Sequence, residues 1–242
     1  MLSHPDRTQL LFQVAEIAGE QTYLRHGITA GEGDVVLDVG ANVGVAAAFF
    51  AVLCGVGCVH SFEPVAPVFA ILRENLRGLP ACVPHEQGLA SAAGRVPITY
   101  YPGAAAMSGL YADPERDRAL VRTVLINRGL TDEAADDQLA GRYTPQTLSC
   151  EVATLSSVLR EHQIGSVNLL KIDVERAELD VLSGIEDADW PRIDQIVMEV
   201  HDEDGRSQAL AGALAGRGFT VTCEQEAAMR GTAVRMLYAT RR

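Results

Sequence analysis

The stretch DVVLDVGANVG, residues 34–44, decides the fold of this chain. An apolar run ends in Asp38, and two glycines, Gly40 and Gly44, then flank Asn42. This pattern is typical of a buried parallel strand whose carboxyl end turns sharply around a ligand. We therefore expect a strand over residues 35–39, followed by a ligand-binding loop.

The spacing of the loop restricts its ligand. A dinucleotide fingerprint reads G-x-G-x-x-G, and its middle glycine makes room for a pyrophosphate. Here Asn42 takes that place, which disfavours a pyrophosphate. We expect Gly40 to let the backbone turn and Gly44 to let the next helix pack closely. Asp38 is a candidate acceptor for a cationic or amino group of the ligand.

An acid follows the second expected strand. Residues 59–62 are strand-like, and Glu63 follows them, about one strand–helix unit beyond the loop. An acid at this place can accept hydrogen bonds from both hydroxyls of a ribose. Loop and acid together predict an adenosine-type ligand without a pyrophosphate, and S-adenosylmethionine (SAM) fits that description. Tight turns and a helix cap are the alternative interpretation of these residues.

Strands and helices alternate along most of the chain. Besides those above, we expect strands over residues 82–83, 96–101, 167–172, 193–200, 219–223 and 233–238, the last two as a hairpin. Helices are expected over residues 7–26, 45–53, 67–76, 154–162, 175–182 and 207–215. This order predicts an α/β fold with a doubly wound, mostly parallel sheet and helices on both faces.

The chain is interpreted as a single domain over residues 1–242, with an N-terminal helical segment over residues 1–30. Residues 102–147 are polar, interrupt the alternation and contain two expected helices, over residues 116–127 and 132–139. Long insertions of this kind are often lids. We therefore expect a substrate lid, with Met107 and Ser108 near its hinge.

A second group of polar residues lies in the other half. The strand over residues 167–172 carries Lys171 and leads through Asp173 to Glu175, and the next strand ends at Glu199 and His201. Carboxyl ends of adjacent parallel strands meet at one edge, so these side chains are expected to form one rim beside the loop.

His201 is the candidate general base, because it is a histidine at an expected strand exit. Asp173, Glu199 and His201 could also hold Mg²⁺ or Mn²⁺. Lys171 either pairs with these acids or acts in catalysis, and Glu178 is interpreted as a solvated or capping acid. Tyr23 and His26 could close over the amino-acid end of the cofactor or serve in packing.

Composition excludes several classes of protein. The net charge of −12 over 242 residues argues against a general nucleic-acid binder, which needs a basic face. No apolar run approaches the ~20 residues that cross a bilayer. The N-terminus lacks the pattern of a secretory signal, so a cytoplasmic protein is expected. Five cysteines without a C-x-x-C pair suggest neither a disulfide framework nor a zinc ribbon.

Four motifs together resemble the FkbM family of SAM-dependent methyltransferases. They are DVGANVG (residues 38–44), FEP (62–64), KIDVERAELDVLSG (171–184) and MEVH (198–201). The resemblance implies a class I methyltransferase fold and O-methylation of hydroxyl groups, often in natural products. It implies cofactor contacts from Asp38, Gly40, Asn42, Gly44 and Glu63. It also implies an active-site rim of Lys171, Asp173, Glu175, Glu199 and His201.

One position departs from the family pattern. The family commonly has glycine after the second acid of D-V-E-G-A-E, and here Arg176 stands there. Residues 101–118 and 187–206 resemble the branch of the family found as O-methyltransferase domains in polyketide synthases and nonribosomal peptide synthetases. That branch implies a hydroxyl acceptor that is a free small molecule or is bound to a carrier protein.

Three rival functions stay open at the level of sequence. They are N-methylation of a small molecule, binding of SAM without catalysis, and a nicotinamide-dependent oxidoreductase, against which the missing middle glycine counts. The sequence defines neither the acceptor nor the oligomeric state.

Overall fold

The strand predicted by the opening stretch lies inside the main sheet of this computed structural model, which describes residues 2–4 and 6–241. Among these residues, seven strands form one sheet in the order β3-β2-β1-β7-β8-β10-β9. Its strands are β1 (Val35–Val39), β2 (Cys58–Phe62), β3 (Cys82–His85), β7 (Leu169–Ile172), β8 (Gln195–His201), β9 (Thr220–Glu224) and β10 (Val234–Thr240). Within this sheet β10 alone points opposite to the other strands, so the doubly wound, mostly parallel sheet is confirmed.

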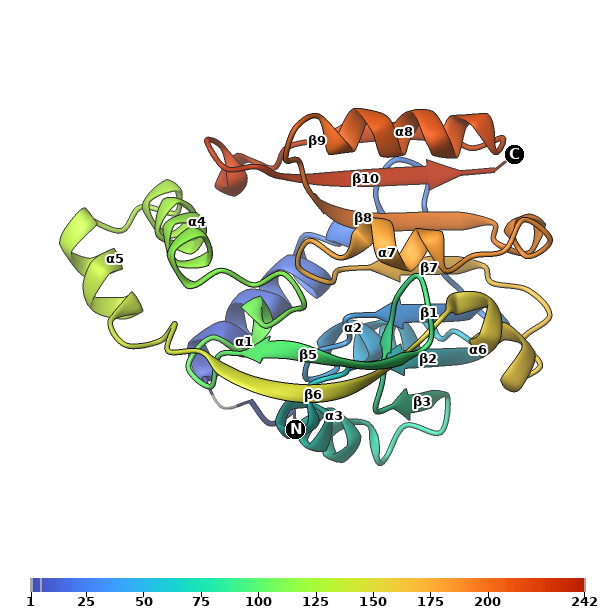
Figure 1. The fold of residues 1–242 in the computed structure, drawn as a ribbon, viewed down its shortest axis with the longest axis horizontal. Helices are drawn as coiled ribbons and strands as arrows, with labels where there is room; N and C mark the ends of the chain where they lie inside the picture. The colour runs from blue at the N-terminus through green and yellow to red at the C-terminus, as the bar shows by residue number, and fades with distance from the viewer. Residues whose placement is uncertain (1, 5, 242) are drawn as a thin grey trace.

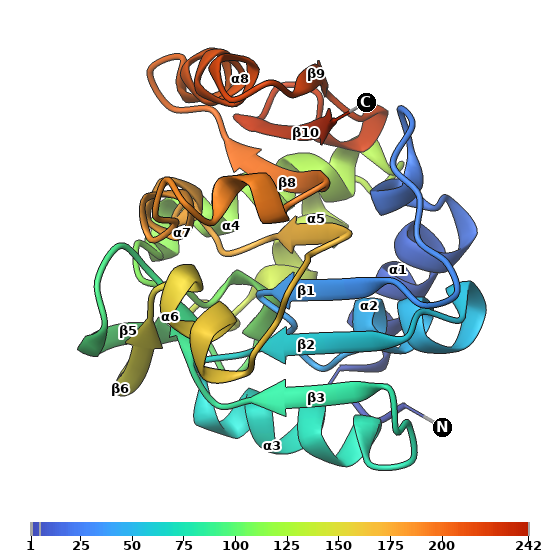
Figure 2. The same ribbon diagram turned by 90° about the vertical axis from the view of Figure 1, so that its right-hand side faces the viewer.

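Helices cover both faces of this sheet (Figures 1 and 2). One face carries α1 (Arg7–Val14), α2 (Val45–Ala48) and α3 (Ala66–Leu76), and the other carries α6 (Leu155–Glu161), α7 (Glu178–Ser183) and α8 (Arg206–Gly216). Alternation along β1 builds the two cores, because Val36 packs into the first and Leu37 into the second. Burial on both faces explains why the strand is apolar at consecutive positions.

The pairing register brings the predicted site residues to one edge. Val39 of β1 is paired with Phe62 of β2 and with Ile172 of β7, and Ile172 is paired with Met198 of β8. Three of the residues that follow these positions leave the sheet, and the fourth lies within β8 near its end, so all four meet at the same edge. They are Gly40, Glu63, Asp173 and Glu199, which sequence separates by up to 159 positions.

A smaller sheet and two helices lie beyond this edge (Figure 1). The small sheet has the order β4-β6-β5, with β4 (Gly88–Leu89), β5 (Gly94–Tyr100) and β6 (Gln146–Ala153). Between β5 and β6 the chain forms α4 (Pro114–Asn127) and α5 (Asp132–Leu139). These helices have a small core of their own that includes Tyr101, Leu125, Leu139 and Tyr143.

Two expected helices are shorter than predicted. The helix expected over residues 7–26 ends as an α-helix at Val14, continues as a π turn over Ala15–Gly19 and breaks at Gln21, whose φ is +51°. The helix expected from residue 175 begins only at Glu178, because Glu175 and Arg176 have φ of +50° and +73°. Left-handed backbone cannot continue a right-handed helix.

Over residues 2–4 and 6–241, none of the helices combines the length and the apolar composition needed to span a bilayer.

Candidate active site

A cavity of about 300 Å³ lies at the carboxyl edge of the main sheet. One end is formed by the loop after β1 and by Glu63, and the other by Asp173, Glu175 and Glu199. Residues of α1 and α4 close its sides. A pocket of this size, with a few converging polar groups, is the common form of a small-molecule site.

The glycine loop is shaped by the chain around it. Gly40 has a φ of +78°, and a Cβ atom there would lie 1.7 Å from the carbonyl oxygen of Asp173. Gly44 has a φ of +90°, and a Cβ atom there would lie 2.7 Å from Leu72 of α3. The structure therefore supports the predicted turn at Gly40 and close packing at Gly44. Gly40 and Asn42 line the cavity, whereas Gly44 lies behind it.

Glu63 is buried in the cavity wall and holds the loop. Its carboxylate accepts hydrogen bonds from the backbone N–H of Asn42 (3.0 Å) and of Val65 (2.9 Å). Burial outweighs these two bonds and raises the pKa of Glu63 to about 7. Each carboxylate oxygen has a further lone pair, so the same group can also accept a ribose hydroxyl.

Asp38 and Lys171 brace the loop from below. The Lys171 ammonium donates to the carbonyl of Gly40 at 2.7 Å and lies 3.0 Å from the carboxylate of Asp38. Burial lowers the pKa of Lys171, but Asp38 and Asp173 outweigh it, so the pKa is raised and the lysine stays charged. Asp38 is fully buried and does not line the cavity. In this geometry Asp38 lies beneath the loop and not in the cavity wall, and Lys171 pairs with Asp38 and Asp173.

Tyr23 and His26 lie in different surroundings. The Tyr23 hydroxyl lines the cavity and donates to Asp173 at 2.9 Å. His26 pairs instead with Glu224 at 2.9 Å and packs on Tyr238, away from the cavity. Of the two roles left open for His26, the structure supports packing, because the neighbouring β9–β10 pair holds its ring.

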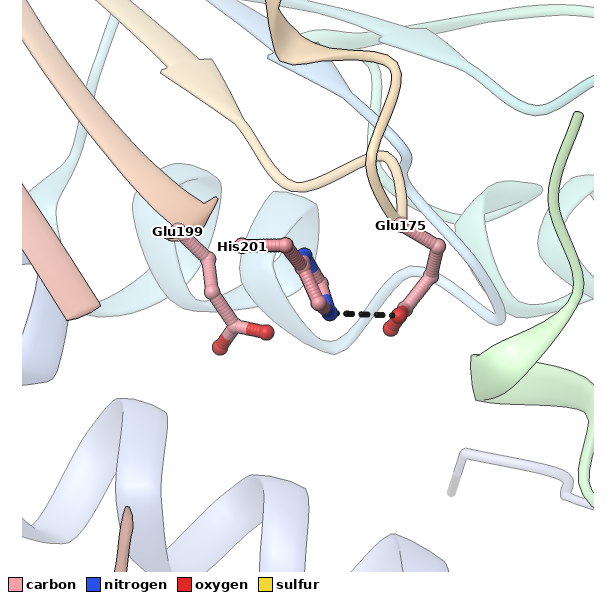
Figure 3. Close-up of side chains that lie close together, drawn as sticks. All are labelled: Glu175, Glu199 and His201. Carbon is pink, nitrogen blue, oxygen red and sulfur yellow. Dashed lines mark ion pairs between the residues drawn. The ribbon is translucent and has the colours of Figure 1, made fainter. Parts of the chain in front are cut away.

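Glu175, Glu199 and His201 lie together at the acidic end (Figure 3). Glu199 and His201 leave β8 on one side, as strand alternation predicts. The His201 imidazole is held between two carboxylates, with Nε2 3.2 Å from Glu175 and Nδ1 3.1 Å from Glu178. Burial alone lowers the pKa of His201, but the bonds to these carboxylates raise it to about 11.

This environment bears on the predictions for His201 and Glu178. An imidazole with such a pKa is already protonated at neutral pH and cannot take a further proton, so the geometry does not support His201 as the general base. Glu178 is not a solvated acid, because it is fully buried and also accepts a hydrogen bond from the backbone N–H of Arg176.

The Glu199 carboxylate differs from its neighbours. It lines the cavity and, in the part of the chain that the structure describes, forms no hydrogen bond or ion pair. Burial, followed by the charges of Asp173 and Glu175, raises its pKa well above the ordinary value. A carboxylate with a raised pKa, open to a cavity, is suited to accept a proton.

The predicted metal set of Asp173, Glu199 and His201 is not the one that converges. The ligand atoms of Glu175, Glu199 and His201 lie within 4.8 Å of one another, while Asp173 is bonded to Tyr23. The imidazole must lose its proton before it can bind a metal. Mg²⁺ moreover prefers oxygen ligands. The residues therefore fit a divalent ion poorly as they are arranged.

Sequence reasoning missed part of the cavity wall. Glu16, Arg128 and Met229 line it, and burial followed by the charge of Glu226 raises the pKa of Glu16 to about 7. A signal for Glu16 was present, since Gln9, Phe12, Gln13 and Glu16 recur at helical spacing on a face separate from the aliphatic one. The other two residues carry no local pattern.

Fold and site together define a class I methyltransferase that uses SAM. The sequence profile described as the methyltransferase FkbM domain matches residues 38–221. The chain belongs to the FkbM family of methyltransferases.

Curated relatives support this assignment, and a solved structure shares the fold. The chain is 40% identical to 31-O-demethyl-FK506 methyltransferase FkbM of Streptomyces tacrolimicus, over 99% of this chain and 93% of the relative. It is 37% identical to the AMB antimetabolite synthetase AmbE of Pseudomonas aeruginosa, over 98% of this chain but only 12% of the synthetase. The methyltransferase FkbM of Methylobacillus flagellatus shares the fold, with a TM-score of 0.59, 14% identity and coverage of 90% of this chain and 46% of that one.

Proposed function

We propose that this protein transfers the methyl group of SAM to a hydroxyl group of a natural-product intermediate. The observation that carries the proposal is the cavity itself, which joins a cofactor loop to the carboxylate of Glu199. This carboxylate has a raised pKa and forms no hydrogen bond or ion pair with any residue that the structure describes.

The cofactor end is assigned to residues 40–42 and Glu63. Backbone of the loop would lie against the adenosine, and Glu63 would accept the ribose hydroxyls. Tyr23 and Asp173 stand where the amino-acid end of SAM would lie, and Asp173 would accept from its ammonium group. Lys171 holds the loop in this shape through the carbonyl of Gly40.

The acceptor end is assigned to Glu175, Glu199 and the wall from α4. The acceptor oxygen forms a bond to the methyl carbon, and the carbon–sulfur bond breaks with its electron pair remaining on sulfur. The hydroxyl proton passes to the Glu199 carboxylate. The His201 cation would hold Glu175 in place, and alignment in a cavity that excludes water would supply most of the rate enhancement.

Two relatives suggest the class of acceptor. The name of the FK506 methyltransferase states that it acts on an oxygen of a natural product. AmbE is a synthetase in which the matching region is a small part. The acceptor is therefore proposed to be a hydroxylated polyketide or peptide intermediate, either free or bound to a carrier protein.

The segment over residues 102–147 is proposed to be the substrate lid. Leu120, Val121 and Val124 of α4 line the cavity, as do Met107 and Ser108 at the predicted hinge. Substrate would enter when α4 moves away from the carboxyl edge, and closure would exclude water.

A methylation assay with labelled SAM tests the proposal. Hydroxylated polyketide and peptide acceptors, free and on a carrier protein, are compared with matched amines, with and without EDTA. We expect O-methylated product to form at the same rate with and without EDTA. Transfer to amines only would identify an N-methyltransferase, and loss of activity with EDTA would support a metal requirement. Cofactor binding without transfer to any acceptor would support a non-catalytic SAM-binding domain.

A further inference from the structure

The backbone beside the acceptor end is strained at two consecutive residues. Glu175 and Arg176 have φ of +50° and +73°, in a region that favours glycine. Such strain persists only where surrounding contacts fix it, and it clusters at functional sites. Glycine would be less strained at position 176, so the arginine side chain there is expected to make contacts that offset the strain.

The side chain of Arg176 reaches α4. Its Nη1 lies 2.6 Å from the carboxylate of Asp117, and both residues are buried, Asp117 completely. Asp117 also accepts hydrogen bonds from the Tyr101 hydroxyl (2.9 Å) and the backbone N–H of Asp113 (2.9 Å). A buried, charge-assisted pair thus joins the first turns of α4 to the loop that carries Glu175.

Arg176 is also held on its own side. Its backbone N–H donates to Glu178 at 3.0 Å, and its carbonyl accepts from Arg206 at 3.4 Å. The carboxylate of Glu178 in turn binds His201. Arg176 therefore connects the wall of the cavity in α4 with the acids that line its acceptor end.

A second cavity lies on the other side of α4. It measures about 550 Å³ and is lined by Arg116, Leu120, Arg176 and His201 among others. Leu120 lines both cavities. The first half of α4 thus has a cavity on either side, and ion pairs help to hold it, from Asp117 to Arg176, from Arg116 to Glu203 and from Arg118 to Asp136. Of the acidic and basic residues in these pairs, Asp117 and Arg176 are the buried ones.

We infer that Arg176 is a positioning residue that latches α4, through Asp117, against the acceptor end of the cavity. The inference rests on the proposed function, which defines that end. Breaking the latch loosens the first half of α4 and leaves the cofactor end intact, since within residues 2–4 and 6–241 no hydrogen bond or ion pair joins Arg176 or Asp117 to residues 40–42 or to Glu63.

Hydrogen exchange of the whole protein tests this inference without any acceptor. The variants are Arg176→Gly, Arg176→Lys and the double variant Arg176→Gly with Asp117→Asn. Glycine suits the backbone at position 176, and asparagine can still accept from Tyr101, so the double variant leaves no buried unpaired carboxylate. Asn127→Ala is the matched control, because Asn127 ties the other end of α4 to the carbonyls of Ala228 and Arg230.

In Arg176→Gly and the double variant, amides over residues 118–124 should exchange about tenfold faster or more, while those of β1 and β7 stay protected. Arg176→Lys keeps the charge, so its exchange rates in α4 should lie closer to those of the parent protein. Asn127→Ala should speed exchange only at the C-terminal end of α4.

Unchanged exchange in α4 would overturn the latch, as would an equal rise in every element, which marks global destabilisation. Titration with S-adenosylhomocysteine separates the two proposals. Intact cofactor binding with unchanged exchange in α4 refutes only the latch, whereas absent binding in the parent protein refutes the proposed function.

Discussion

At the scale of single residues, the lack of a Cβ atom in glycine determines the shape of the cofactor site. The loop after β1 approaches the carbonyl of Asp173 so closely that no side chain fits at Gly40. The sequence pattern indicated a turn there, but the partner of that approach lies 133 positions along the chain. Only the pairing of β1 with β7 identifies it.

Gly40→Ala should abolish cofactor binding and destabilise the fold. Gly55→Ala is the matched control, because Gly55 also has a positive φ (+70°) but has open space around its Cα. The control should lose about 1 kcal/mol from backbone strain. Gly40→Ala should lose clearly more, because backbone must also move. Chemical denaturation of both variants measures the difference, and equal losses would contradict the account of the loop.

The chemistry at Glu199 depends on its protonation state. Glu199→Gln should lower kcat by about 10²–10⁴-fold, the usual contribution of a general base, with little change in the affinity for S-adenosylhomocysteine. Burial and neighbouring acids raise the pKa of Glu199, so kcat of the parent enzyme should rise with pH as this carboxyl group loses its proton. The variant should lack that rise. A variant with the same pH–rate profile as the parent would exclude Glu199 as the base.

At the scale of elements, the sequence predicted the strands and helices with a regular apolar pattern. It missed short strands and helix boundaries that tertiary contacts set. The main strands were predictable because buried parallel strands are continuous apolar runs. The smaller sheet was predicted only at β5. Leu148, Cys150 and Val152 of β6 alternate with polar residues, and this strand pattern beside the insertion could have predicted β6. The late start of α7 was not predictable, because tertiary contacts hold Glu175 and Arg176 in left-handed backbone.

Three elements meet at a cluster of histidines, and this cluster should make the stability of the fold depend on pH. His60 of β2 lies 3.0 Å from His85 of β3, and the ring of His162 after α6 packs on both. Burial, followed by the charges of His162 and His60, lowers the pKa of His85 to about 4. The unfolded chain therefore binds a proton more tightly than the folded protein does.

The melting temperature should accordingly fall as pH decreases from about 6.5 towards 4, the interval between the ordinary pKa of histidine and that of His85. In His85→Gln this fall should be shallower. Thermal unfolding at several pH values measures both slopes. Equal slopes of melting temperature against pH in the two proteins would show that His85 does not contribute to the pH dependence of stability.

At the scale of the whole molecule, the order of strands and helices was enough to predict the edge at which the site forms. Parallel strands with crossover helices bring their carboxyl ends together, so Gly40, Glu63, Asp173 and Glu199 were predictable as neighbours. The direction of each side chain was not. Asp38 and His201 stand at the predicted edge, yet one is buried beneath the loop and the other is paired with two carboxylates.

The central claim is that SAM lies across the loop after β1 with its ribose on Glu63. Isothermal titration with S-adenosylhomocysteine tests it most directly, comparing the parent protein with Glu63→Ala and with Glu86→Ala, an exposed acid, as control. We predict micromolar binding that Glu63→Ala weakens by more than about tenfold, or 1.4 kcal/mol, and that Glu86→Ala leaves unchanged. Because the pKa of Glu63 is about 7, binding should also weaken as pH falls below neutrality. A folded parent protein that does not bind, or a folded Glu63→Ala that binds as tightly, would contradict the claim.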